Sequence, residues 1–111
     1  MRHIMAAGLL LAGCSVSAGD PPSLVLQTDS PLDQAVQCVI TGLDGVWDWK
    51  HVATISGPDE REIRPVHISP HDLYFVRVRR DGDKVRVTVY GVGRFGTRAM
   101  AAVANCGDPL I

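Results

Sequence analysis

The chain has 111 residues, 46% of them hydrophobic, and a formal net charge of −1. This composition fits one domain with one core and excludes a repeat or low-complexity protein. The charge is uneven: residues 20–72 hold 3 Lys and Arg against 9 Asp and Glu, whereas residues 73–111 hold 7 against 3. Such an imbalance bears on the partners of the protein, not on its fold.

The chain opens with a short apolar segment that ends in a cysteine. Ile4 to Ala12 has the length of a signal-peptide apolar region, far below the ~20 residues that span a bilayer. Leu11-Ala12-Gly13-Cys14 resembles the bacterial lipobox, after which a signal peptidase cuts and a lipid is attached to the new N-terminal cysteine. The resemblance implies a signal peptide over residues 1–13 and a lipid on Cys14.

Ser15 follows that cysteine, and in lipoproteins a serine there implies sorting to the outer membrane, here on its periplasmic side. A second cut stays open, because Val16-Ser17-Ala18 offers the small residues that an ordinary signal peptidase needs. That cut would leave a soluble periplasmic protein that begins at Gly19.

The cysteine count supports export under either cut. Without Cys14 as a free thiol, Cys38 and Cys106 remain as an even pair, which predicts one disulfide in an oxidising compartment. The chain-entropy model values so long a loop at about 4 kcal/mol, which is a large contribution for a domain this small.

Residues 14–23 predict a spacer before a single domain over residues 24–111. Leu24-Val25-Leu26 predicts the first strand, and Ser30-Pro31 marks a helix start that ends at Gly42 or Gly45. One helical face carries the apolar residues Leu32, Ala35, Val36, Val39, Ile40 and Leu43.

Trp47 and Trp49 lie in a segment whose extended form would point both indoles to one side, in line with Ala53 and Ile55. Two indoles on one face can stack on a sugar ring, which makes them candidate contacts for an envelope saccharide. The same face continues as Ala53 and Ile55, which favours a role in covering the core.

Residues 56–62 predict a polar turn with acidic residues, and Ile63 to Ile68 a strand. His67 and His71 would pair on a metal ion only if helical, and Pro70 disfavours that helix. No metal site is therefore expected.

The clearest pattern is a hairpin from Tyr74 to Tyr90 around Asp81-Gly82. A register that keeps its valines on one face gathers Arg77, Arg79 and Arg86, here called the arginine cluster, on the other. Like charges that face each other cost stability, so the cluster is either solvated or contacts an anionic partner.

Gly91-Val92-Gly93-Arg94-Phe95-Gly96 matches the dinucleotide pattern G-x-G-x-x-G. The chain ends too soon for the second strand and the ribose-binding acid of that pattern, so the glycines are interpreted as a flexible link. Thr97 is then predicted to cap a last helix over residues 98–106, whose N-terminus would form a modest anion site with Arg94 and Arg98.

Together these elements predict an α+β fold, a small two-layer sandwich in the order β-α-β-β-β-β-α. One antiparallel sheet carries two helices on one face, joined by Cys38 and Cys106. The predicted core is Leu32, Val36, Val39, Ile40, Ile55, Val76, Val78, Val85, Val87 and Val103.

The function indicated is a membrane-anchored, non-catalytic lipoprotein that acts as a binding or accessory module of the cell envelope. Its expected partners are the membrane, through the lipid, and an envelope protein or anionic envelope component, with no cofactor, metal ion or nucleic acid. A structural subunit of an envelope assembly, which an exposed sheet edge would favour, and a soluble periplasmic binding protein stay open. An enzyme would require a deep pocket that joins a histidine to a carboxylate.

Overall fold

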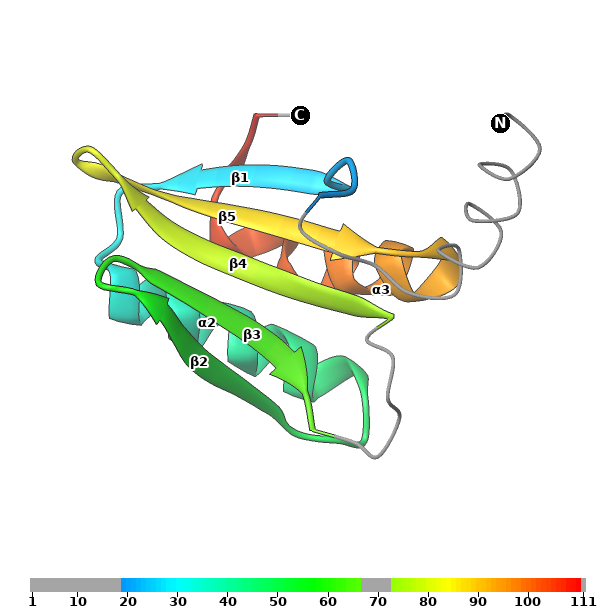
Figure 1. Ribbon diagram of the computed structural model, residues 1–111. Helices are drawn as coiled ribbons and strands as arrows, with labels where there is room; N and C mark the ends of the chain where they lie inside the picture. Colours follow the sequence, from blue (N-terminus) through cyan, green and yellow to red (C-terminus); the bar gives the residue numbers. More distant parts are fainter. Residues whose placement is uncertain (1–18, 67–72, 111) are drawn as a thin grey trace, which may run out of the picture.

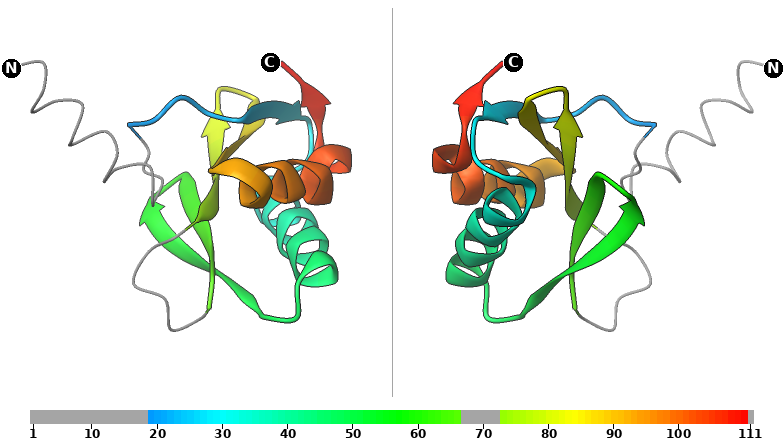
Figure 2. Two further views of the ribbon diagram at one scale, coloured as in Figure 1. Left: turned by 90° about the vertical axis from the view of Figure 1, so that its right-hand side faces the viewer. Right: turned by 90° about the vertical axis from the view of Figure 1, so that its left-hand side faces the viewer.

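The protein is a two-layer α+β sandwich. The computed structural model describes residues 19–66 and 73–110. One antiparallel sheet has the strand order β2-β3-β4-β5-β1-β6, and both longer helices lie on the same side of it (Figure 1, Figure 2). The elements in chain order are β1 (Leu24–Thr28), α2 (Leu32–Val46), β2 (His51–Gly57), β3 (Glu60–Pro65), β4 (Tyr74–Asp81), β5 (Lys84–Gly91), α3 (Gly93–Val103), the 3-10 turn η1 (Ala104–Cys106) and β6 (Asp108–Pro109).

The predicted fold class and element order are confirmed, with η1 and the short β6 added at the end. Antiparallel pairing sets which side chains share a face. Val76 lies opposite Val89, and Val78 lies opposite Val87, so these valines form one apolar face toward the helices. We call this the helix face, and the opposite side of the sheet the outer face.

The core lies between the helix face and the buried stripe of α2, which comprises Leu32, Ala35, Val39 and Leu43. Nine of the ten predicted core residues are buried or pack against the core. Ile55 is the exception, because its residue is 72% exposed. Buried apolar residues that the prediction omitted are Leu26, Ala35, Leu43, Trp47, Ile63, Tyr74, Phe75, Val89, Tyr90, Ala99 and Cys106.

Helix α2 does not end at Gly42 or Gly45, as predicted, but continues to Val46. A Cβ at Gly42 would collide with the backbone carbonyl oxygen of Ala102. Gly42 therefore allows close approach to the end of α3 and is not a helix stop. At the other end, the N-cap is Pro31 and not Ser30, and the carbonyl of Pro31 accepts from the N–H of Ala35.

The glycines after β5 are also not a flexible link. Helix α3 begins at Gly93, and Gly96 is buried inside it. A Cβ on Gly91 would collide with the Cα of Gly96, and a Cβ on Gly96 would lie 2.8 Å from the carbonyl carbon of Gly91. The glycine pattern therefore serves the packing of α3 on the end of β5, which requires backbones without side chains between them.

Candidate functional site

The predicted disulfide between Cys38 and Cys106 is present. It joins α2 to η1, and the two Cα atoms are 5.8 Å apart. This separation lies in the ordinary range for a disulfide. The bond closes the helical layer across a sequence separation of 68 residues.

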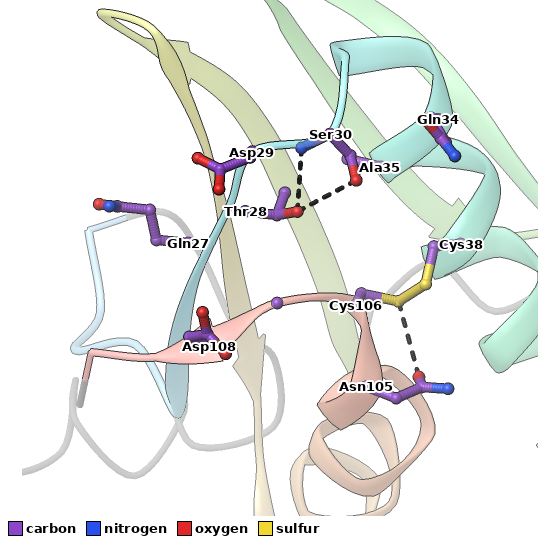
Figure 3. A pocket seen from close by; sticks show the side chains of 11 residues that line it. Gln27, Thr28, Asp29, Ser30, Gln34, Ala35, Cys38, Asn105, Cys106 and Asp108 are labelled. Carbon is purple, nitrogen blue, oxygen red and sulfur yellow. Dashed lines mark hydrogen bonds between the residues drawn. A yellow bond between two sulfur atoms is a disulfide. The ribbon is translucent and has the colours of Figure 1, made fainter.

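A pocket of about 410 Å³ lies beside this disulfide, between the end of β1, the start of α2 and η1 (Figure 3). Its polar lining is partly bonded to itself: the N–H of Ser30 donates to Thr28 Oγ1 at 3.1 Å. The carboxylate of Asp29, on the rim, pairs with Lys84. Thr28 and Ser30 thus hold the β1–α2 connection, and we assign no ligand to this pocket.

The arginine cluster lies on the outer face, as the alternation predicted. Arg79 stands directly opposite Arg86, and Arg77 stands opposite Thr88. The neighbouring strand β3 places Glu60 opposite Arg79 and Glu62 opposite Arg77. The predicted polar turn over residues 56–62 is too long, because β2 runs to Gly57 and β3 begins at Glu60, which leaves Pro58-Asp59 as the turn.

These acids neutralise much of the cluster. Arg77 Nη2 donates to Glu62 Oε2 at 2.7 Å, and Arg64 Nη2 lies 3.0 Å from Glu62 Oε1. Arg86 Nη2 lies 2.8 Å from Asp81 Oδ2, and Arg79 Nε lies 4.0 Å from Glu60 Oε1. Opposite charges thus meet across the outer face, which makes it a zwitterionic surface.

The pairing shifts the titration of both central groups. The hydrogen bond from Arg77, followed by that from Arg64, lowers the pKa of Glu62 below its ordinary value against the opposing effect of burial. The same hydrogen bond to Glu62 raises the pKa of Arg77. Both groups therefore stay charged at neutral pH.

Trp47 and Trp49 stack on each other but do not form an open aromatic platform. Trp47 is the C-cap of α2, and its residue is 8% exposed. Its ring packs against Trp49, with centroids 5.7 Å apart, and against Tyr74, with centroids 4.3 Å apart, and the guanidinium of Arg98 lies 5.5 Å from its centroid. Because Trp47 is nearly buried by these contacts, its ring does not offer an open face on which a sugar could stack.

A polar chain joins this aromatic cluster to the end of α2. His51 Nδ1 lies 2.8 Å from Asp44 Oδ1, and His51 Nε2 lies 2.7 Å from the hydroxyl of Tyr74. The indole N–H of Trp49 donates to the same hydroxyl at 2.8 Å. If neutral His51 carries its proton on Nδ1, it donates to Asp44, and its Nε2 accepts from the Tyr74 hydroxyl. Every donor among these hydrogen-bonded side chains then has an acceptor.

Asp44, His51 and Tyr74 are thus hydrogen-bonded in the order that a proton relay needs. They include the histidine–carboxylate pair that an enzyme hypothesis requires. The side chain of His51, however, is 0% exposed. His51 also donates its backbone N–H to Asp44 at 3.0 Å. We therefore interpret the chain as a buried link that fixes the start of β2 against α2 and β4.

Helix α3 begins at Gly93, five residues before the predicted start at Arg98, so that Arg94 also lies inside the helix. The predicted cap Thr97 sits inside this helix, where its hydroxyl donates to the carbonyl of Gly93. The N-cap is Val92, which has no capping side chain. The guanidinium of Arg98 lies 5.5 Å from the centroid of the Trp47 ring, so the predicted anion site built on Thr97 is wrong.

The position of strand β2 at an exposed edge of the sheet is the feature that sequence reasoning missed. Within the described residues it pairs with β3 alone, because it forms one edge of the sheet (Figure 1). It carries no Asp, Glu, Lys or Arg over its whole length. Val52 is 49% exposed on the outer face, and Ile55 is 72% exposed on the helix face, beyond the reach of both helices.

An edge strand of this kind offers an unpaired row of N–H and C=O groups to another chain. Protein edges usually carry charged residues or proline that prevent such pairing. The sequence H-V-A-T-I-S-G has neither. The alternation of exposed apolar residues at Val52, Ala53 and Ile55 is the signal that could have indicated it.

The predicted lipidation of Cys14 and the predicted arrangement of His67 and His71 fall on residues outside the described ranges. Among residues 19–66 and 73–110, no helix is long and apolar enough to cross a membrane. Comparison of the chain with protein-family models, with curated proteins and with solved structures finds no match.

Proposed function

We propose that the protein is a non-catalytic accessory module of the bacterial cell envelope. A lipid on Cys14 holds it on the periplasmic side of the outer membrane, and the open edge of β2 pairs with a partner protein. The observation that carries the contact is the edge itself, because it is seven residues long, uncharged and apolar on both faces. Strand addition supplies affinity through main-chain hydrogen bonds and specificity through alternate side chains.

The lipobox supports the tether, since Leu11-Ala12-Gly13-Cys14 ends the apolar segment. A tether also suits a contact through one strand, because anchoring in the same membrane raises the local concentration of both partners. Intact mass of the protein extracted from membranes tests this part. A chain that begins at Cys14 and carries acyl chains supports it, whereas an unmodified chain that begins at Gly19 refutes it.

The arginine cluster is the weaker contact candidate. Its charges are offset by Glu60, Glu62 and Asp81 on the same face. An anionic lipid surface or acidic partner would have to compete with these ion pairs. We therefore place the contact at β2 and expect neutralisation of the cluster to leave partner binding intact.

Capture from detergent-solubilised membranes tests the contact strand. The tagged full chain is compared with Ile55→Lys, which puts a charge on the exposed edge, and with Leu110→Lys. Leu110 is a matched control because it is 48% exposed and follows β6 at the opposite edge of the sheet.

We expect Ile55→Lys to reduce the co-isolated envelope protein at least tenfold and Leu110→Lys to leave it unchanged. Equal recovery with all three chains would show that β2 is not the contact strand.

A further inference from the structure

Strand β2 is complementary to itself, and we propose that its edge pairs with the β2 edge of a second copy of this chain. The pairing is antiparallel about a two-fold axis at Thr54, and it joins two sheets into one with all helices on the same side. The inference deepens the proposed function, because it names the partner of the same strand.

The first step is to identify which groups of β2 face outward. The N–H of Val66 donates to the carbonyl of Lys50 at 2.8 Å, and in an antiparallel ladder the groups that face the partner alternate. Val52 and Thr54, which lie opposite Arg64 and Glu62, therefore bond to β3. The backbone groups of Ala53 and Ile55 point away from β3, to the open edge.

The second step fixes the register. The outward N–H of His51 is already taken by Asp44, and Gly57 lies beyond the irregularity that follows Ile55. Within β2, Ala53 and Ile55 are thus the residues that can each offer both an N–H and a C=O. Pairing Ala53 of one copy with Ile55 of the other uses both groups of both residues, and it places the symmetry axis at Thr54.

The side chains fit this register. Directly opposed residues lie on the same face, so the exposed Ile55 of one copy covers the small Ala53 of the other. On the outer face, Val52 lies opposite Ser56 of the second copy. No like charges meet along the strand, because β2 contains none.

At each end of the paired strands, a positive side chain of one copy lies next to a negative side chain of the other. The register places Lys50 of one copy next to the turn Pro58-Asp59 of the other. Lys50 is exposed, and the Asp59 side chain is 62% exposed although it also pairs with Arg80. Two symmetric Lys50–Asp59 contacts therefore favour this antiparallel arrangement, which a parallel one would not allow.

Cysteine cross-linking tests the register in the full chain exported to the membrane. In this pairing Thr54 and its symmetry mate form a non-hydrogen-bonded pair with Cα atoms about 4.5 Å apart, which suits a disulfide. Ser56, on the same face of the same strand, lies about 13 Å from its symmetry mate. Thr54→Cys and Ser56→Cys therefore compare two exposed hydroxyl residues of one strand face that differ in the expected distance to the symmetry mate.

We expect a non-reducing gel to show at least tenfold more disulfide-linked dimer for Thr54→Cys than for Ser56→Cys or the parent chain. Adding Ile55→Lys to Thr54→Cys should remove that excess, whereas adding Leu110→Lys should not. Equal cross-linking of Thr54→Cys and Ser56→Cys would overturn the proposal, because it reports random collision.

The two proposals fail separately. If Thr54→Cys stays monomeric while Ile55→Lys still abolishes capture of a different envelope protein, the second copy is excluded and the proposed contact strand stands. If Ile55→Lys changes neither the cross-link nor the capture, both are wrong.

Discussion

Loss of the Cys38–Cys106 disulfide should remove most of the stability of this domain. The bond joins residues 68 apart, and the chain-entropy relation gives about 15 cal/mol/K for a loop of that size, or about 4 kcal/mol at 25 °C. Domains of this size have unfolding free energies of only about 5 to 10 kcal/mol. The bond is thus expected to decide whether the fold persists when it is reduced.

Urea unfolding, followed by the fluorescence of Trp47 and Trp49, measures this effect with and without a thiol reductant. We expect the reductant to lower the unfolding free energy by about 4 kcal/mol and, in a thermal melt of the same samples, to lower the midpoint temperature by roughly 20 °C. The control is the double variant Cys38→Ala/Cys106→Ala, which should be as unstable as the reduced parent and insensitive to the reductant. A loss below about 1 kcal/mol in the parent would refute the reasoning.

Three further predictions concern packing and charge. Gly42→Ala should lower the unfolding free energy by about 1 to 3 kcal/mol, because its Cβ meets the backbone of α3. Gly45→Ala, whose Cβ meets nothing within 4 Å, should instead raise the unfolding free energy by about 0.5 to 1 kcal/mol. If urea unfolding shows the same direction of change for both variants, the close contact between Gly42 and α3 is contradicted. Tyr74→Phe should cost about 2 to 4 kcal/mol in the same assay, since buried His51 Nε2 and the half-buried indole N–H of Trp49 lose their hydrogen bonds to the Tyr74 hydroxyl; a neutral effect would contradict these hydrogen bonds. The lowered pKa of Glu62 means that its contribution is complete above its unfolded pKa of about 4.3 and is lost as the pH falls through the lower folded pKa. Unfolding free energies measured from pH 6 to 3 should therefore fall more steeply for the parent than for Glu62→Gln, and identical slopes would contradict the ion pair.

Local patterns sufficed to predict the hairpin from Tyr74 to Tyr90. Its alternation of apolar and polar residues and its Asp81-Gly82 turn both lie within one continuous segment. The alternation correctly predicted that the arginine cluster lies on the outer face. The disulfide followed from counting cysteines in a chain that the sequence predicts to be exported. These inferences hold because each depends on one segment or on composition alone.

Features that depend on two distant segments were missed. Glu62 could not be assigned to Arg77, because the pairing requires that β3 begin right after the short Pro58-Asp59 turn. His51 gains its role from Tyr74, 23 residues later. Gly42 and Gly96 resemble helix breakers by propensity, and only the contact with a neighbouring backbone explains their place inside helices.

The wrong prediction that Ile55 is a core residue has a similar cause, because its burial depends on where the helices lie. Its alternation with Ala53 suits a buried strand, and the helices would have had to cover β2 for that prediction to hold. Helix α2 instead lies against the sheet where the valines of β4 and β5 face it, and the far end of β2 extends beyond the core. An apolar alternation can thus belong to an exposed edge strand as well as to a buried one.

Amide hydrogen exchange with residue resolution, on the protein extracted from membranes in mild detergent, tests the role of the β2 edge most directly. The N–H groups of Val52 and Thr54 bond to β3 and serve as an internal reference that is protected in every variant. We predict that the N–H groups of Ala53 and Ile55 exchange at least tenfold more slowly in the parent than in Ile55→Lys. Fast exchange of Ala53 and Ile55 in the extracted parent, beside protected Val52 and Thr54, would contradict the account.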